Sequence, residues 1–267
     1  MSTAASRLVD ANQIQTPTIP RRRRVVTSQP LSRYLGATML LGILGLSIVV
    51  PLISASPDNF VALPLQAPSW SHLFGTDEFG RDIFVRTFAA GRADLFVVVT
   101  GVTTSLLFGT TVGVMVTAAK RRVWETVLMR IVDSILAFPF IVLVLALVLI
   151  FGATRSYGPF PAGMPSLLIA IFVWNWAIYA RLARAQTLVL RKRDFITAVR
   201  LAGYSHLRIV LRHLMPQVFR TAAAYGVTDA MIVLITTAGL PFLGAGVQPP
   251  TPELSLIHIS EPTRQAE

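Results

Sequence analysis

The chain has 267 residues, of which 53% are hydrophobic and 14% are charged, against roughly 25% charged residues in an average soluble domain. It carries a formal net charge of +11 and no cysteine, which excludes disulfides, thiolate metal sites and cysteine nucleophiles. The apolar residues fall in long uncharged blocks and do not alternate with polar ones, so the composition indicates a membrane protein.

The N-terminal residues, 1–32, are polar and basic and show no helical periodicity. We expect them to form a disordered cytoplasmic tail. The first apolar block follows over residues 35–53 and is long enough to cross a hydrocarbon core of about 30 Å as a helix. A cleavable signal peptide is the alternative, but this block exceeds the usual length of about 7 to 15 apolar residues.

Four further apolar blocks give a prediction of five spans in an all-α polytopic membrane helical bundle. Gly109 and Gly113 lie in GxxxG spacing in the second block, which allows two helices to approach closely. Pro139 interrupts the third block and predicts a kink. The four blocks cover residues 95–119, 134–154, 164–180 and 221–246.

The basic residues predict the orientation of the chain. When loops are assigned alternately to the two sides, 19 of the 24 Lys and Arg fall on the side of the N-terminus and 5 on the other. Positive loops stay in the cytoplasm, so the N-terminus is predicted to be cytoplasmic. The basic clusters abut apolar blocks and lack interleaved aromatic residues, which argues against nucleic-acid binding.

Residues 54–93 form a long polar stretch between the first two blocks and are predicted to be an ordered extracytoplasmic insertion. Its charged residues, among them Asp77, Arg81 and Asp82, can form a docking surface for a partner or an internal ion-pair network, and we favour the network. Asp94 and Asp133 lie at block ends, where helix capping is the favoured role.

The loop of residues 181–220 is patterned as two short helices. Asp194 is a candidate cap for the first helix, which would carry Phe195, Ile196 and Val199 on one side. Gly203 supplies the left-handed exit that commonly ends a helix.

The second helix is predicted to start after Ser205, as its N-cap, and to end at Pro216. Its apolar residues follow the i, i+3, i+4, i+7 pattern of an amphipathic helix. Two such helices can lie on anionic lipid or form a compact knob for a soluble partner, and composition does not choose between these alternatives. The apolar residues are Leu207, Val210, Leu211 and Leu214.

Residues 194–216, DFITAVRLAGYSHLRIVLRHLMP, resemble the cytoplasmic loop of permease subunits of bacterial ABC importers. Ala198, Gly203 and Pro216 match the pattern of that loop. Thr197 and Val199 hold the positions of the family's glutamate and second alanine, so no role of that glutamate carries over.

Three more stretches resemble the C-type permease of the dipeptide, oligopeptide and nickel branch of these importers. They are GTDEFGRD at residues 75–82, MRIVDSILAFP at 129–139 and FLGAGVQPPTP at 242–252, and with the loop the resemblance covers residues 33–253. The resemblance implies the transmembrane fold of type I ABC importers, which has six spans. The signature residues are Gly75, Thr76, Asp77, Gly80, Arg81 and Asp82.

The resemblance also implies the partners: a homologous permease subunit, two ATPase subunits and an extracytoplasmic substrate-binding protein, in a prokaryotic inner membrane. The chain has no GxxxxGK[ST] phosphate loop, so ATP hydrolysis is assigned to a partner and no cofactor is expected. The loop that would couple the permease to the ATPase contains Asp194, Phe195, Ile196, Thr197, Ala198, Arg200, Gly203 and Pro216.

Asp229 is the single charge of the last apolar block. An ionisable residue inside a span is a functional candidate because its burial in lipid is costly. It can line the translocation path or contact the second permease, and the alternative is a structural carboxylate satisfied by a hydroxyl such as that of Thr228. No metal site is predicted, because His206 and His213 have no carboxylate at ligand spacing.

The end of the chain departs from the family pattern. LSLIHISEPTR, at residues 254–264, resembles an in-frame translation of a transposase adapter used in sequencing libraries, so residues 254–267 are expected to be non-native. A self-sufficient secondary transporter or channel is the alternative function, but the sequence shows none of the inverted repeats typical of one. A membrane enzyme is disfavoured because HExxH and GxSxG motifs are absent.

Overall fold

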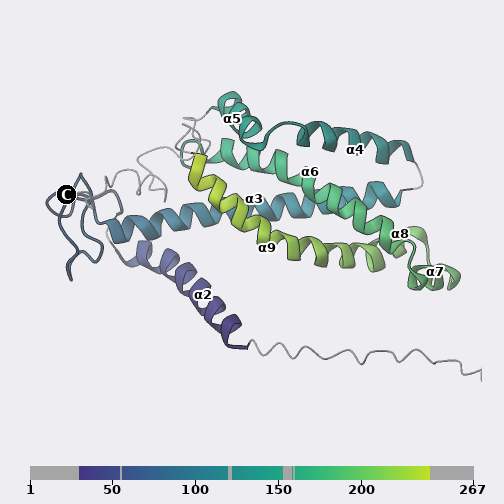
Figure 1. Ribbon diagram of the computed structural model, residues 1–267, viewed down its shortest axis with the longest axis horizontal. Helices are drawn as coiled ribbons and strands as arrows, with labels where there is room; N and C mark the ends of the chain where they lie inside the picture. Colours follow the sequence, from purple (N-terminus) through teal and green to yellow (C-terminus); the bar gives the residue numbers. More distant parts are fainter. Residues whose placement is uncertain (1–29, 55, 120–121, 153–157, 159, 241–267) are drawn as a thin grey trace, which may run out of the picture. The chain divides into compact units, whose positions relative to one another are not determined.

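The computed structural model describes residues 30–54, 56–119, 122–152, 158 and 160–240. Within these ranges the regular elements are helices, residues 54–82 are irregular, and no strand is present. The expectations for residues 1–29 of the N-terminal tail and for residues 241–267 lie outside the described residues. Residues 30–32, which were assigned to the disordered tail, are the first residues of a helix, so the prediction is wrong there. The elements are α2 (Pro30–Ile53), α3 (Ile83–Ala118), α4 (Arg122–Leu136), α5 (Phe140–Phe151), α6 (Met164–Leu190), α7 (Asp194–Leu201), α8 (His206–Ile209), the π-helix η2 (Val210–Leu214) and α9 (Met215–Gly239) (Figure 1).

Four helices are long and apolar enough to cross a membrane, and a bent pair raises the number to as many as five. The four are Tyr34–Ile53, Ile83–Ala118, Met164–Leu190 and His206–Gly239. The predicted five spans therefore require that α4 and α5 be counted as one. Residues 83–93, assigned above to the insertion, form the first three turns of α3.

The third apolar block is broken at Pro139, as predicted. α4 ends at Leu136, Pro139 immediately precedes α5, and the two helices meet at 91°. Proline lacks an N–H donor and disfavours helix at the residue before it, so the helix stops here and restarts in a new direction. α4 also reaches back to Arg122, because the basic loop before the apolar block is helical.

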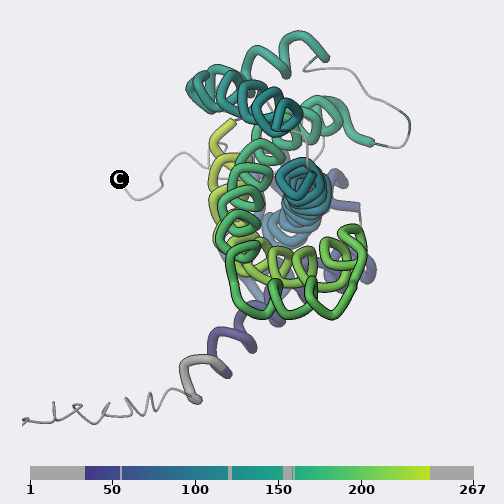
Figure 2. The backbone as a smooth tube through the Cα atoms, turned by 90° about the vertical axis from the view of Figure 1, so that its right-hand side faces the viewer, coloured from purple at the N-terminus to yellow at the C-terminus, as the bar shows by residue number. Residues whose placement is uncertain are grey.

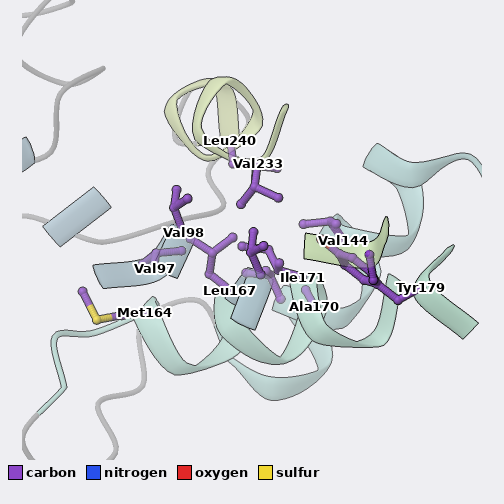
Figure 3. Packing of buried hydrophobic residues seen from close by; sticks show 13 residues of the cluster. Val97, Val98, Val144, Met164, Leu167, Ala170, Ile171, Tyr179, Val233 and Leu240 are labelled. Atoms are coloured by element: carbon purple, nitrogen blue, oxygen red, sulfur yellow. The ribbon is translucent and has the colours of Figure 1, made fainter. Parts of the chain in front are cut away.

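The hydrophobic core lies where α3, α5, α6 and α9 meet. Figure 2 shows α3 nearly end-on, with α6 and α9 beside it. Figure 3 shows side chains of this core, with Val98, Leu167, Ile171 and Val233 gathered at the centre and Met164 at one side. The labelled residues are Val97 and Val98 from α3, Val144 from α5, Met164, Leu167, Ala170, Ile171 and Tyr179 from α6, Val233 from α9 and Leu240.

Residues before Gly42 form a unit separate from the rest of the chain. The first half of α2 belongs to this unit, and the second half belongs to the larger unit. Beyond Gly42, α2 approaches α3 through small residues. A Cβ added to Gly91 would lie 2.9 Å from the Oγ of Ser47. Ser47 is 1% exposed, so its side chain is buried at this contact.

The GxxxG pair predicted from the sequence forms a close backbone contact between α3 and α6. A Cβ at Gly109 would strike the carbonyl oxygen of Trp176, and one at Gly113 would lie 2.7 Å from the carbonyl oxygen of Ala180. Both obstacles are helix backbone, which cannot move aside as a side chain can. The two glycines therefore set the distance between α3 and α6.

We expect Gly109→Ala to destabilise the protein, because an added methyl group would push the backbone of α6 away from α3 at this contact. Overpacking of this kind costs about 1 to 3 kcal/mol, which outweighs the gain in helix propensity of about 1 kcal/mol. The measurement is the thermal unfolding midpoint of the purified protein in detergent. Gly45→Ala is the matched control, since nothing lies within 4 Å of its added Cβ, and an equal midpoint for both variants would contradict the assigned contact.

Candidate functional site

α7 is a helix of eight residues between α6 and α8. Its N-cap is Arg193, whose side chain makes no capping hydrogen bond, and Asp194 is the first helical residue. The prediction that Asp194 caps this helix is therefore wrong by one position. Its carboxylate still lies in the first turn, where the helix dipole favours a negative charge.

The turn after α7 follows the predicted geometry. Gly203 has φ +82°, a left-handed conformation that residues with a Cβ adopt at a cost. The N–H of Gly203 donates to Arg200 O, and the N–H of Tyr204 donates to Val199 O at 3.4 Å. Ser205 occupies the N-cap position of α8 as predicted, although its side chain makes no capping bond.

The prediction that Pro216 ends the second helix is wrong. The residues from His206 to Gly239 form one helical span, and Pro216 lies in the first turn of α9, directly after the π-helix η2. A π-helical turn shifts the hydrogen-bond register, so the bond that Pro216 cannot donate is lost where the register already changes.

The segment from Asp194 to Leu214, which we call the elbow, is anchored by a hydrophobic cluster. Ile196 is 1% exposed and is the buried residue that α7 contributes to it, and the partly buried Val199 packs against the same cluster as expected. Phe195, expected on the same side, is 37% exposed, because neighbouring helical residues point about 100° apart. The buried members are Val114, Ala118, Ala183, Ile196, Ile209, Val210, Leu214 and Val218.

A hydrogen bond also ties the end of α6, three residues before the elbow, to α3. The guanidinium Nη1 of Arg191 donates to the carbonyl oxygen of Thr117 at 2.6 Å. Thr117 lies in the last turn of α3, where carbonyl groups have no helical partner and attract a cation. The elbow is therefore attached to α3 by apolar packing, and the end of α6 that leads into it is attached by a charged hydrogen bond.

The opposite side of the elbow faces outward. Thr197, Ala198 and Arg200 are exposed, and Leu201 is 85% exposed. Such a surface, with apolar and basic groups on a firmly seated helix, suits contact with another protein.

At the other end of α3, two glycines of the insertion allow backbone segments to pack closely, and Thr76 joins these segments by hydrogen bonds. Gly75 and Gly80 have positive φ, and an added Cβ would strike the carbonyl oxygens of Gln66 and Ala62. The hydroxyl of Thr76 donates to Leu63 O at 2.7 Å and accepts from the N–H of Gln66 at 2.9 Å. The signature residues thus cross-link the backbone of the insertion.

Asp77 is the centre of an internal ion-pair network, and this favoured alternative is confirmed. It is 4% exposed, its Oδ1 accepts from the N–H groups of Phe79 and Arg81, and its Oδ2 lies 2.6 Å from Arg81 Nε. The same oxygen lies 3.6 Å from Arg86 Nε, and Arg86 also contacts Asp58 at 3.2 Å. Arg86, from the first turn of α3, was missed by the sequence analysis.

Asp82 joins the insertion to α3. It is the N-cap of α3, and its Oδ1 accepts from the N–H groups of Phe84 and Val85 at 2.8 and 3.3 Å. Its Oδ2 lies 2.9 Å from Nδ1 of His72. The cap could have been found in the sequence, because an aspartate immediately before an apolar run is a start signal for a helix.

Asp229 is a buried carboxylate between α6 and α9. It is 3% exposed, and its Oδ2 accepts hydrogen bonds at 2.9 Å from Asn175 Nδ2 and from the Tyr179 hydroxyl. Its partners are therefore two side chains of α6, and Thr228, the partner suggested by the sequence, is exposed. Nothing local in the sequence links residues 50 positions apart.

The capping roles expected of Asp94 and Asp133 are not supported. Asp94 is buried and lies about three turns inside α3. Asp133 lies in the last turn of α4 and is 2.5 Å from Arg181 Nη2 of α6. The prediction took the ends of the apolar blocks as the ends of helices. The helices continue past those points, so neither aspartate is at a cap position.

The predicted site residues thus form two groups separated by α3. The signature lies at the N-terminal end of α3 and the elbow at its C-terminal end, 36 residues apart, which is roughly 50 Å along a helix. Asp229 belongs to neither group. The arrangement is that of a membrane bundle with a structured surface at each end, and it brings together no catalytic constellation among the described residues.

Comparison with known proteins identifies the family. Residues 109–258 match the model of the binding-protein-dependent transport system inner membrane component. A peptide transport system permease protein of Brucella abortus is 32% identical over 249 residues, which is 91% of this chain and 80% of that protein. The dipeptide transport system permease protein of Alkalihalophilus pseudofirmus is 34% identical over 224 residues, which is 82% of this chain and 69% of that protein.

Members of this family are membrane permease components of ABC transporters, and ATP hydrolysis belongs to their partners. The match begins in the second half of α3 and includes α4 to α9 with the elbow, and the Brucella relative extends it over the insertion. The chain therefore belongs to the family of binding-protein-dependent transport system inner membrane components, and it is a non-catalytic, multi-pass permease subunit of an ABC importer.

Proposed function

We propose that the chain is one of two homologous permease subunits that together form the translocation path for peptides or related small solutes. The relatives named for peptide and dipeptide transport support this substrate class. Transport of nickel chelates, which the sequence resemblance allowed, stays a prediction. Membership of a binding-protein-dependent family argues against a self-sufficient transporter or channel.

The elbow is the proposed seat of the ATPase. The observation that supports this role is the burial of Ile196 beneath an exposed outer face formed by Thr197, Ala198 and Arg200. Because α7 is packed on α3, α6 and α9 through one cluster, a force on its outer face would reach three helices at once. ATP-driven closure of the ATPases would then shift the population of membrane conformations.

The proposed orientation places the N-terminus and the elbow in the cytoplasm. The 19 Lys and Arg assigned to that side outnumber the 5 on the other. The insertion would then face the extracytoplasmic space, where a binding protein delivers substrate. Glu78, exposed beside the Asp77 network, is a candidate contact for that protein.

We expect a cysteine at position 200 to react with a membrane-impermeant maleimide only from the cytoplasmic side. The chain has no cysteine of its own, so Arg200→Cys gives a single thiol, and Arg200 is exposed. The measurement compares labelling of intact cells with labelling of inverted membrane vesicles. Glu78→Cys is the matched control and should show the reverse pattern, whereas labelling of position 200 in intact cells would overturn the proposed orientation.

Gly203→Pro should uncouple the permease from its ATPase. Proline fixes φ near about −65°, whereas Gly203 has φ +82°, so the exit from α7 cannot keep its path. We expect co-purification with the ATPase subunits and substrate-stimulated ATP hydrolysis to fall severalfold while the amount of permease in the membrane is unchanged.

The control is Gly158→Pro, which alters another glycine of positive φ, +64°, with nothing within 4 Å of an added Cβ. Gly158 lies before α6, away from the elbow. Normal coupling in the Gly203 variant, or equal loss in both variants, would refute the assigned role of the elbow.

Asp229 is proposed to line or border the translocation path. Its two hydrogen bonds to α6 show that the carboxylate is satisfied in this conformation, which equally suits a structural role. A movement of α9 relative to α6 during transport would break these bonds and expose the charge. The two roles differ in what a neutral residue of the same shape would do.

We expect Asp229→Asn to lower substrate uptake by about tenfold, the effect of roughly 1.4 kcal/mol on a barrier, without lowering the thermal unfolding midpoint. An amide can keep a hydrogen bond to Tyr179 but carries no charge. Tyr179→Phe is the comparison, because it removes one of the two bonds and leaves the charge. If, in both variants, the loss of uptake is accompanied by a matching loss of stability, then Asp229 has a structural role and the proposed role in the path is wrong.

A further inference from the structure

A groove of about 440 Å³ lies between α4 and α6, at the end of these helices nearest the elbow. Its walls include the guanidinium groups of Arg122, Arg130 and Arg184 and the carboxylates of Glu125 and Asp133. Neither the coupling role of the elbow nor the translocation path uses these residues.

The two carboxylates of the groove are already neutralised. Glu125 Oε1 lies 2.8 Å from Arg184 Nε, and Asp133 Oδ1 lies 2.5 Å from Arg181 Nη2. Arg122 and Arg130 have no ion pair with any residue that the structure describes. The groove therefore presents two uncompensated positive charges.

These two arginines lie on one stripe of α4. With Thr126 between them they follow i, i+4, i+8 spacing, so Arg122 and Arg130 are about two turns, or roughly 12 Å, apart along the helix. Both side chains are exposed. They can therefore reach a single bulky anionic group lying along the groove.

A second pocket, of about 340 Å³, adjoins the first through Leu188. It adds Lys192 and Arg193 to the basic surface and Val189 to the apolar one. The combined surface has positive groups around an apolar floor, which matches an amphipathic anion better than a small inorganic one.

The face of α4 beside the groove is apolar and exposed. Val123, Trp124, Val127 and Ile131 are 69%, 58%, 44% and 48% exposed. Tryptophan is enriched at membrane interfaces, at the level of the lipid headgroups. A soluble partner bound to the arginines would leave this apolar face in water, whereas lipid would cover both surfaces.

We propose that the groove binds the phosphate headgroup of an anionic phospholipid such as phosphatidylglycerol, with Arg122 and Arg130 contacting the phosphate. The acyl chains would lie against the exposed apolar face of α4. Basic pockets between transmembrane helices on the cytoplasmic side bind such headgroups. The inference goes beyond the transport function and depends only on the membrane location and orientation of the chain.

The test is native mass spectrometry of the full chain in detergent with equal amounts of phosphatidylglycerol and phosphatidylcholine. We expect preferential retention of one phosphatidylglycerol. The double variant Arg122→Gln, Arg130→Gln should weaken this binding by roughly fivefold for each basic residue removed. Arg220→Gln is the matched control, because Arg220 is exposed on α9 and does not line the groove.

A lysine variant and a displacement experiment complete the test. Arg122→Lys, Arg130→Lys should retain binding, since an ammonium group also binds phosphate, and this variant separates loss of charge from misfolding. Equal retention of both lipids, full binding by the glutamine variant or loss in the lysine variant would overturn the proposal. So would displacement of the lipid by glycerol phosphate or by the partner subunits of the assembled importer.

Discussion

The close contact between α3 and α6 at Gly109 and Gly113 is the constraint on which the rest of the structure depends. The backbone of α6 occupies the space where side chains at these positions would stand. Because α3 and α6 are held together there, the hydrophobic core can form on the N-terminal side of the contact along α3, and the elbow cluster can form on its C-terminal side. α3 also carries the insertion at its other end, so a single helix connects the two proposed partner surfaces.

The elbow shows how local sequence signals combine with packing. Gly203 and Ser205 could be placed from the sequence because backbone conformation at a turn depends on residue type. The separation of Ile196 from Phe195 could not be predicted, since both are large and apolar and the tertiary packing of the surrounding helices decides which one is buried. Pro216 misled for a related reason: a proline usually ends a helix, but here a π-helical turn lies directly before it.

Hydropathy located the apolar helices in the described part of the chain but underestimated the lengths of α2, α3 and α6. α3 begins twelve residues before its uncharged block. An apolar block is taken to end at the first charged residue, whereas the helix continues through Arg86 and Asp94. The ion pairs of Asp77 and the hydrogen bonds from α6 to Asp229 join residues that no short pattern relates. The type of fold was therefore predictable from composition and order, while the polar network required the tertiary structure.

The link between Arg86 and the insertion limits how α3 can move. Its guanidinium lies in the first turn of the helix and is held by Asp58 and Asp77. Sliding α3 along its own axis would draw this charge into hydrocarbon, at a cost of several kcal/mol, and would also pull apart the insertion. Piston-like motion is thus opposed at this end, and tilting or rotation about a fixed outer pivot is the movement left to the helix.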